Sequence, residues 1–216
     1  IAATYPMEYL CLDIKYIYVH ADRRNYYLLT ILDVFSRRTV DQIFQKSIRQ
    51  MDVINAFRRI QQQYGIKGVT IRNDNGSQFI ANSVKQYLRA AEADQEFTHV
   101  ATPEENSYIE AFHSIVQREV VDRYEFDSFY HAKHILAAHR SWYDNRRNHR
   151  MIGMIPKEKW EQNIHITQAK REQISEHQIT QVQEIKNNRT AEYSDEKLPL
   201  NSNTYYTTNS QILSNL

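Results

Sequence analysis

Apolar runs that alternate with polar turns occupy the first half of the chain, and this pattern is typical of β-strands. Three runs rich in β-branched and aromatic residues lie at residues 9–19, 26–34 and 39–45, with short polar connections between them. Because such short connections join neighbouring antiparallel strands, we expect a meander of three strands. Two shorter runs, at residues 69–72 and 97–100, predict a fourth and a fifth strand.

Apolar residues at helical spacing separate and follow the later strands. The spacing predicts helices over residues 51–64, 83–93, 107–122 and 128–145, and Gly65 is a typical stop for the first of them. An antiparallel meander followed by alternating helices and strands indicates an α/β fold. We therefore predict a mixed five-stranded sheet, its first three strands antiparallel, flanked by helices.

The composition changes near residue 165. From there to the end the chain contains no Gly, Trp, Phe or Met and is rich in Gln, Asn, Ser and Thr. We therefore divide the chain into a core domain, residues 1–165, and a polar C-terminal extension, residues 166–216. The extension is open to two interpretations: a polar helix over residues 166–190 with a short strand at 204–208, or partial disorder.

Charge and cysteine content exclude several classes of protein. The 27 Lys and Arg residues against 26 Asp and Glu give a net charge of +1, which neither indicates nor excludes a nucleic acid partner. A single cysteine, Cys11, excludes an intrachain disulfide and argues against a zinc site built on thiolates. No apolar run reaches the roughly 18 residues of a membrane helix, so we expect no membrane partner. Because the sequence begins with Ile1 and shows no signal peptide, we expect a piece of a longer protein.

Three carboxylates stand at positions where chemistry is common. Asp13 lies inside the first predicted strand, where aspartate is disfavoured, and Asp74 follows the short strand at residues 69–72. Glu110 lies near the start of a helix that begins either at Pro103, by a capping box, or at Ser107. Each acid has an ordinary interpretation, because exposed strands, Asn-Asp-Asn-Gly turns and solvated helices all carry acids.

The three acids also belong to a longer series of motifs. The matching blocks are residues 12–17 (LDIKYI), 32–38 (LDVFSRR), 73–79 (NDNGSQF), 106–113 (NSYIEAFH) and 143–149 (YDNRRNH), followed by Gly153 and Pro156. With these blocks, and with 35 residues between Asp74 and Glu110, the sequence resembles the integrase-type catalytic core of bacterial insertion-sequence transposases, which are relatives of retroviral integrases. The resemblance extends over about residues 5–162.

The resemblance implies a ribonuclease-H-like fold with an Asp-Asp-Glu metal site. Asp13 would bridge two Mg²⁺ ions, Asp74 would hold one of them and Glu110 the other, with Mn²⁺ as a substitute. Carboxylate oxygens suit such hard cations, and two ions can activate the attacking oxygen and stabilise the leaving one. The implied activity is DNA strand cleavage followed by strand transfer, in which a 3′-hydroxyl end attacks a target phosphodiester.

The partners implied by the resemblance are transposon ends and target DNA. Because transposition joins two DNA ends, we expect a homodimer or a larger assembly, acting at the nucleoid in the bacterial cytoplasm. Similar proteins carry an N-terminal helix-turn-helix region, which this sequence would lack. Two alternatives stay open: a ribonuclease-H-like nuclease without strand transfer, and a catalytically inactive DNA-binding or assembly module.

Several residues are candidates for DNA contact. Asn106, Glu110 and Gln117 share one helix face, although related transposases often place Lys or Arg seven residues after the catalytic Glu. Arg118 is adjacent but points about 100° away in an α-helix. Lys15, on the same strand face as Asp13, is a candidate for the replacement cation and equally an ordinary exposed lysine.

A basic stretch near the end of the core domain adds further candidates. Residues 140–150 carry Arg146, Arg147 and Arg150 as well as Arg140. Arginine suits phosphate contact through its planar donor fork, and cations at a helix C-terminus are also favoured by the helix dipole. Both interpretations can hold at once.

Asp33 is the main rival of Asp13. Pairing Val19 with Tyr26 places Asp13 opposite Leu32, and Asp33 then lies on the other side of the sheet, where we expect it to stabilise a turn beside Ser36.

The histidines are weaker candidates for the metal site. We interpret His131 and His134 as ordinary residues of a helix surface, because no further ligand completes a zinc pattern. His99 and His113 fall near the predicted site, where each would support a ligand before acting as one.

Overall fold

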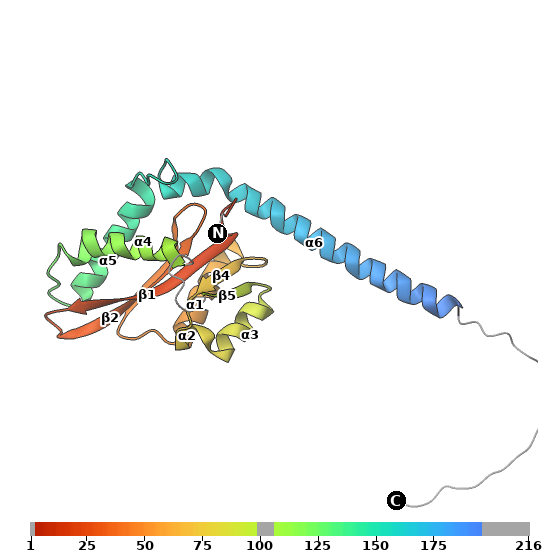
Figure 1. Cartoon of the computed structure of the whole chain (residues 1–216), viewed down its shortest axis with the longest axis horizontal. Coiled ribbons are helices and arrows are strands. Elements are labelled where there is room, and N and C mark those ends of the chain that lie inside the picture. The colour runs from red at the N-terminus through yellow and green to blue at the C-terminus, as the bar shows by residue number, and fades with distance from the viewer. Residues whose placement is uncertain (1–2, 99–105, 196–216) are drawn as a thin grey trace, which may run out of the picture. The chain divides into compact units, whose positions relative to one another are not determined.

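Five strands form one mixed sheet in the order β3-β2-β1-β4-β5 in this computed structural model, which describes residues 3–98 and 106–195. The strands are β1 (Tyr9–Val19), β2 (Arg24–Asp33), β3 (Thr39–Gln45), β4 (Thr70–Asn73) and β5 (Asp94–Phe97). The first three are antiparallel, and β4 and β5 run parallel to β1 (Figure 1). The predicted mixed sheet of five strands is confirmed.

The helices lie between and after the later strands. They are α1 (Gln50–Tyr64), α2 (Ser77–Ile80), α3 (Asn82–Ala90), α4 (Ser107–Val116), α5 (Phe129–Arg146) and α6 (Pro156–Asp195). A π-helical turn, η2 (Gln117–Val121), continues α4 without a break. The described part of α4 begins at Ser107, whereas the alternative start at Pro103 lies outside the described residues.

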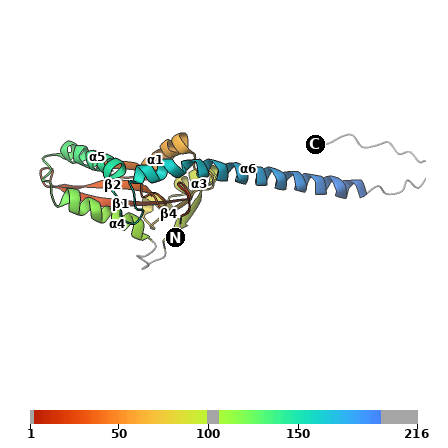
Figure 2. The same cartoon turned by 90° about the horizontal axis from the view of Figure 1, so that it is seen from above.

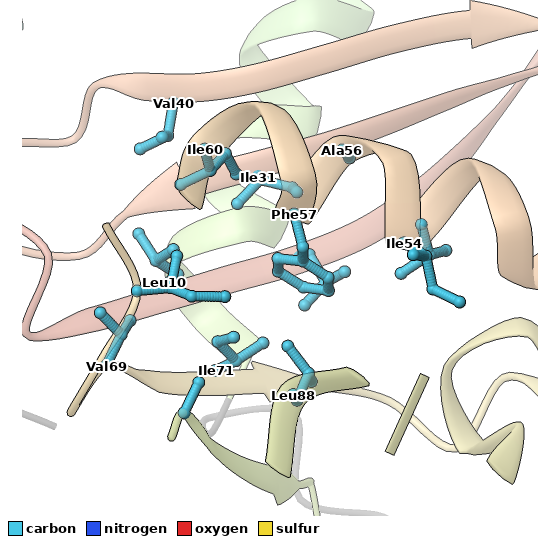
Figure 3. Packing of buried hydrophobic residues seen from close by; sticks show 14 of the residues in the cluster. Leu10, Ile31, Val40, Ile54, Ala56, Phe57, Ile60, Val69, Ile71 and Leu88 are labelled. Carbon is cyan, nitrogen blue, oxygen red and sulfur yellow. The ribbon is translucent and has the colours of Figure 1, made fainter. Parts of the chain in front are cut away.

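Two apolar cores cover the two faces of the sheet. On one face, Phe57 and Ile60 of α1 pack against Leu10, Ile31 and Ile71 of the strands (Figure 3). On the other face, Phe112 of α4 and Tyr143 of α5 pack with Cys11, Ile17 and Leu28. Alternate residues of β1 therefore serve opposite cores, and Figure 2 shows α1 and α4 on opposite sides of β1 and β2.

The hairpin register differs from the prediction by two residues. Val19 pairs with Arg24, and Asp13 therefore lies opposite Thr30 where Leu32 was predicted. The connection spans only residues 20–23, and Arg23 adopts the left-handed conformation (φ 50°) that a tight turn requires. A shift of two residues keeps every side chain on its face of the sheet, so Asp33 lies opposite Leu10 and away from Asp13, as predicted.

The fifth strand begins three residues earlier than predicted. We predicted residues 97–100, whereas β5 spans Asp94–Phe97. It is an edge strand, and its first three residues, Asp, Gln and Glu, are polar, so no apolar run marks it in the sequence.

Contacts divide the chain into two units, residues 1–174 and 175–216. Within the first unit, residues just past 165 still contact the sheet domain. The hydroxyl of Thr167 donates to the Pro6 carbonyl at 2.6 Å, and Arg171 donates to the carbonyls of Tyr64 and Gly65. In the second unit the described residues, 175–195, are helical, and the predicted strand at 204–208 lies outside the described residues.

A buried carboxylate joins the end of α5 to the start of β3. Asp144 accepts hydrogen bonds from the Thr39 amide (2.9 Å) and the Thr39 hydroxyl (2.8 Å), while Arg140 donates to the Thr39 and Val40 carbonyls. Burial raises the pKa of the Asp144 carboxyl, and the Thr39 donors oppose that rise. The YDNRR motif therefore contains at least one residue that fastens the fold.

Thr39→Val is expected to lower the free energy of unfolding by about 1 to 2 kcal/mol. The change keeps the side-chain volume but removes one of the two Thr39 donors to a carboxylate that stays buried. Urea denaturation of the full chain measures the effect. Thr39→Ser, which keeps the hydroxyl, is the matched variant and should lose clearly less; equal losses would contradict this role for the hydroxyl.

Candidate active site

Asp13 lies on β1, and Asp74 directly follows the neighbouring parallel strand β4. Strand β1 pairs with β4 through Leu10 and Ile71, then Cys11 and Arg72. If this register is extended by two residues, it leads from Cys11 to Asp13 and from Arg72 to Asp74, and neighbouring strands are about 5 Å apart. Asp74 follows the last residue of β4, which is the carboxyl end where α/β sheets collect their ligand sites.

The turn after β4 holds the Asp74 side chain. Its Oδ1 accepts a hydrogen bond from the Gly76 amide at 2.9 Å, and the Asn73 side chain donates to the Asp74 carbonyl. A Cβ atom at position 76 would lie 3.0 Å from the Asp74 Oδ1 and closer still to the Gln78 side chain. A side chain at position 76 would therefore force Gln78 and Asp74 to shift, and the turn interpretation of NDNG holds together with the strand-end placement of Asp74.

A groove runs between β1 and α4. It has a volume of about 560 Å³ and is lined by Asp13, Ile14, Lys15, Tyr16, Glu110, His113, Ser114, Gln117 and Arg118. Two of the three predicted acids, Asp13 and Glu110, thus border the same groove, and Glu110 is exposed to solvent. Asp74 is not among its lining residues. Within residues 3–98 and 106–195, no three His, Cys, Asp or Glu side chains lie together closely enough to hold one ion.

The groove exists because β4 is short. Strand β4 ends at Asn73, whereas β1 continues to Val19, so the second half of β1 has no β4 neighbour along that edge. The Ile14 amide donates to the Asp13 Oδ1 at 2.7 Å. This local hydrogen bond holds one carboxylate oxygen of Asp13 at the edge of the strand.

The second carboxylate oxygen of Asp13 faces a histidine. His113 of α4 is buried, and its Nδ1 lies 3.3 Å from the Asp13 Oδ2. On the other side of the ring, Nε2 lies 3.4 Å from the Thr30 hydroxyl. His113 therefore lies between Asp13 and Thr30, close to the groove, while His99 lies outside the described residues.

Two cations border the groove. Burial lowers the pKa of the Lys15 amine, while Asp122 and Asp13 raise it. Arg118 is exposed and lines the groove together with Gln117. Both residues lie at the start of the π turn, in which the Asp122 amide donates to the Gln117 carbonyl at 2.9 Å. Because a π turn holds more residues than an α turn, successive side chains rotate by slightly less than 100°, and the two neighbours border the same wide groove.

The other two predicted contacts of α4 are less free to meet DNA. The side-chain amide of Gln117 donates to Asp122 at 2.6 Å. Asn106 is buried, and its Oδ1 has no hydrogen-bond partner among the described residues.

The basic stretch divides into structural and exposed residues. Arg147 pairs with Glu119 of the π turn, which also lies 3.1 Å from His139 of α5. The hydrogen bonds and charges of these partners lower the pKa of Glu119 against the effect of burial. This cluster of Glu119, His139 and Arg147 joins the end of α4 to α5, and no motif or spacing in the sequence indicates it. Arg146 and Arg150 are exposed.

Asp33 has the structural role that was predicted for it. The side chain is fully buried and accepts hydrogen bonds from the Met7 amide (2.8 Å), the Ser36 amide (2.7 Å) and the Ser36 hydroxyl (2.6 Å). Burial raises the pKa of Asp33 to about 6, although these three donors oppose the rise. The structure thus assigns Asp33 to the turn that follows β2.

His131 and His134 lie on the surface side of α5. His131 interacts with Asp127 and its amide donates to Ser128, which caps the helix, and His134 is exposed.

Comparison with known families identifies the domain to which this groove belongs. Residues 3–103 and residues 91–156 match two family descriptions, each named as an integrase core domain.

Relatives of this chain occur in bacterial insertion elements. The chain is 26% identical over 127 residues to an uncharacterised protein of insertion element IS407 from Burkholderia multivorans, covering 59% of this chain and 46% of that protein. It is 23% identical over 134 residues to the transposase for insertion sequence element IS904 from Lactococcus lactis, covering 61% of this chain and 53% of the transposase. The chain spans about half the length of these relatives.

Solved structures share the fold at low sequence identity. The catalytic core domain of HTLV-2 integrase, solved in complex with magnesium, superposes with a TM-score of 0.58 at 15% identity, covering 73% of this chain and 99% of that one. A chain from the structure of the simian T-cell lymphotropic virus intasome in complex with PP2A regulatory subunit B56 gamma gives a TM-score of 0.63 at 12% identity, covering 74% of this chain and 56% of that one. The ribonuclease-H-like fold is thereby confirmed.

None of the helices within residues 3–98 and 106–195 has the length and apolarity to cross a membrane.

Proposed function

We propose that this chain, which carries an integrase core domain over residues 3–156, cleaves DNA strands and joins the resulting ends to target DNA. The observation that supports the proposal is that Asp13 lies on β1 and Asp74 directly follows the neighbouring parallel strand β4, while Asp13 and Glu110 border one groove. The other described acids of these motifs, Asp33 and Asp144, are engaged in holding turns and helix ends.

The donor set at this position fits magnesium. Asp13, Asp74 and Glu110 offer carboxylate oxygens, which Mg²⁺ prefers, and the groove is open enough to admit phosphate oxygens and water. Asp13 would be shared between two ions, with Asp74 and Glu110 completing one each and Mn²⁺ as a substitute. When bound, the ions would activate the attacking oxygen and stabilise the leaving oxygen of an in-line displacement.

The reaction needs no nucleophile from the protein. In the cleavage step, water or a hydroxyl attacks phosphorus, and the broken P–O bond leaves a 3′-hydroxyl that takes up a proton. In the joining step, that 3′-oxygen attacks a target phosphodiester, so one P–O bond forms as another breaks. The chain's own part is to bind and orient the two strands in the groove.

Lys15 and Arg118 supply positive charge for the DNA backbone at this groove. Both line it together with Asp13, so a phosphate beside the carboxylates would lie within reach of either side chain. Of the remaining candidates, Arg146 and Arg150 are exposed and could extend the contact, whereas Asn106, Gln117 and Arg147 are committed to the fold by burial or by protein partners.

Arg118→Gln is expected to weaken DNA binding and to lower the slope of log affinity against log salt by about 1, because one phosphate contact is lost. Arg147→Gln is the matched variant, since it removes the same charge from a residue that is paired with Glu119. It should reduce stability and leave the salt slope almost unchanged. Fluorescence anisotropy with a labelled duplex at several salt concentrations measures both; a larger change in slope for Arg147→Gln would reverse the assignment.

We further propose that the protein acts as a dimer or larger assembly on bacterial DNA. Its relatives belong to bacterial insertion elements, and one structure of the same fold is described as an intasome. Joining a transposon to its target requires two ends, which a homodimer would hold together.

A joining assay tests the proposed function. The full chain is incubated with a supercoiled plasmid and a fluorescent duplex bearing a free 3′-hydroxyl, in Mg²⁺ or in Mn²⁺. Fluorescence joined to the plasmid supports strand transfer. A nicked plasmid without joined label supports a nuclease that lacks strand transfer, and DNA binding without any cleavage in either metal supports an inactive module.

A further inference from the structure

A chain of hydrogen-bonding groups crosses four elements and ends on Asp13. Gln42 of β3 donates to the Thr30 hydroxyl of β2 at 3.3 Å, and Thr30 lies 3.4 Å from Nε2 of His113 in α4. Nδ1 of the same ring lies 3.3 Å from the Asp13 Oδ2 of β1. Thr30 is fully buried and His113 is 7% exposed, so water competes little for these contacts.

With a neutral His113 ring, the donors and acceptors of this chain agree in only one direction. An ionised carboxylate can only accept, so the proton on the ring must lie on Nδ1, facing Asp13. In the neutral ring Nε2 then accepts, and the Thr30 hydroxyl must donate to it. Thr30 can do so because its oxygen is the acceptor for Gln42. The hydrogen bond at each step therefore determines which atom donates and which accepts at the next step.

We infer that His113 is a positioning residue, which holds the Asp13 carboxylate in the orientation needed to bind a divalent cation at the groove. This inference rests on the proposed function. Without His113, the Ile14 amide would fix only the Asp13 Oδ1, and the carboxylate would be free to rotate about its Cβ–Cγ bond. Hydrogen-bonded partners of this kind orient ligand carboxylates, and losing one typically weakens metal affinity about 10- to 100-fold.

Three substitutions at His113 separate orientation of Asp13 from packing of α4. His113→Asn places an amide donor where Nδ1 lies and keeps the contact to Asp13. His113→Gln places its amide near the position of Nε2 and keeps the contact to Thr30 instead. His113→Leu removes both contacts but packs well in a buried helix, whereas asparagine is the poorer helix former.

The measurement is the affinity of the full chain for Mn²⁺ by calorimetric titration, together with its thermal unfolding midpoint. We expect His113→Asn to stay close to wild type in affinity, and His113→Gln and His113→Leu to lose about 10-fold or more. The unfolding midpoint should follow a different order, with His113→Leu above His113→Asn. An affinity ranking that follows the stability ranking would overturn the inference, because His113 would then serve only to pack α4.

A pair of variants at Thr30 tests the contact between its hydroxyl and Nε2 of His113. Thr30→Val keeps the shape but removes the hydroxyl, while Thr30→Ser keeps the hydroxyl. Thr30→Val should weaken Mn²⁺ affinity more than Thr30→Ser, and the reverse order would contradict the path. If the wild type binds Mn²⁺ and cleaves DNA while all His113 variants match it, only this inference fails. If the wild type neither binds Mn²⁺ nor cleaves DNA, the proposed function fails with it.

Discussion

Asp13→Asn and Asp74→Asn are each expected to reduce DNA cleavage at least about 100-fold in either Mg²⁺ or Mn²⁺. Asparagine has almost the volume of aspartate but no negative charge, so it cannot compensate the charge of a divalent cation. The fold should tolerate both changes. The amide oxygen can still accept from Ile14 at position 13 and from Gly76 at position 74. Cleavage of a labelled duplex, followed under single-turnover conditions, measures the loss.

Asp94→Asn is the matched control for these two variants. Asp94 is an exposed aspartate on the edge strand β5 and takes no part in the groove. Its variant should keep wild-type cleavage, and all three variants should unfold near the wild-type temperature. Full activity in Asp13→Asn or Asp74→Asn would remove the residue concerned from the proposed site. Glu110→Gln extends the same test to α4.

Asp33→Asn is expected to lower the free energy of unfolding by about 3 kcal/mol near pH 4 and to leave the cleavage rate per folded molecule within a few-fold of wild type. An amide offers one acceptor oxygen where the carboxyl offers two, so a buried donor from Met7 or Ser36 loses its partner. This outcome would separate the structural acid Asp33 from its rival Asp13.

The loss of stability in the same variant should depend on pH, and the burial of Asp33 decides the direction of that dependence. The folded pKa of Asp33 is about 6, above its unfolded value, so the folded state binds more protons between about pH 4 and pH 6. The contribution of Asp33 to stability is therefore greatest below pH 4 and decreases as the pH rises through 6. Denaturant unfolding of wild type and Asp33→Asn at pH 4, 5, 6 and 7 should show the stability gap narrowing. A stability difference that increases with pH would mean that the three hydrogen-bond donors lower the pKa of Asp33 by more than burial raises it.

The mixed sheet of five strands was predictable because most of the strands are indicated twice in the sequence, by an apolar run and by the polar turn that follows it. The placement of Asp13 and Asp33 on opposite faces of the sheet was also predictable. Side chains alternate between the two faces along a strand, and a register shift of two residues does not change the face. The exact pairing was not predictable, because it depends on the hairpin turn at residues 20–23, whose left-handed Arg23 carries no glycine or asparagine signal. Strand β5 was predicted three residues too late because its first residues are polar and form no apolar run.

In the candidate site, too, the residues predicted from the sequence are those marked by local motifs, whereas roles that depend on contacts distant in sequence were not predictable. Asp13 and Asp74 were found through strand positions and motifs, which are local in sequence. The roles of Arg147 and His113 depend on contacts with residues 28 and 100 positions away, Glu119 and Asp13. Spacing within one element cannot reveal such pairs. An arginine in a basic stretch was therefore interpreted as a DNA contact, although the fold pairs it with Glu119.

The π turn at Gln117–Val121 acts like a one-residue insertion that leaves no gap in the written sequence. In the transposases that this chain resembles, a cation often stands seven residues after the catalytic glutamate, and here Gln117 occupies that position. The eighth residue, Arg118, borders the same groove, so a comparison made position by position counts a lost cation where the helix retains one at the next position. Deleting one residue within this turn would rotate Glu119 away from His139 and Arg147, which it contacts on α5 and just after it. Length variation at this point of the helix would therefore change which side chains face α5.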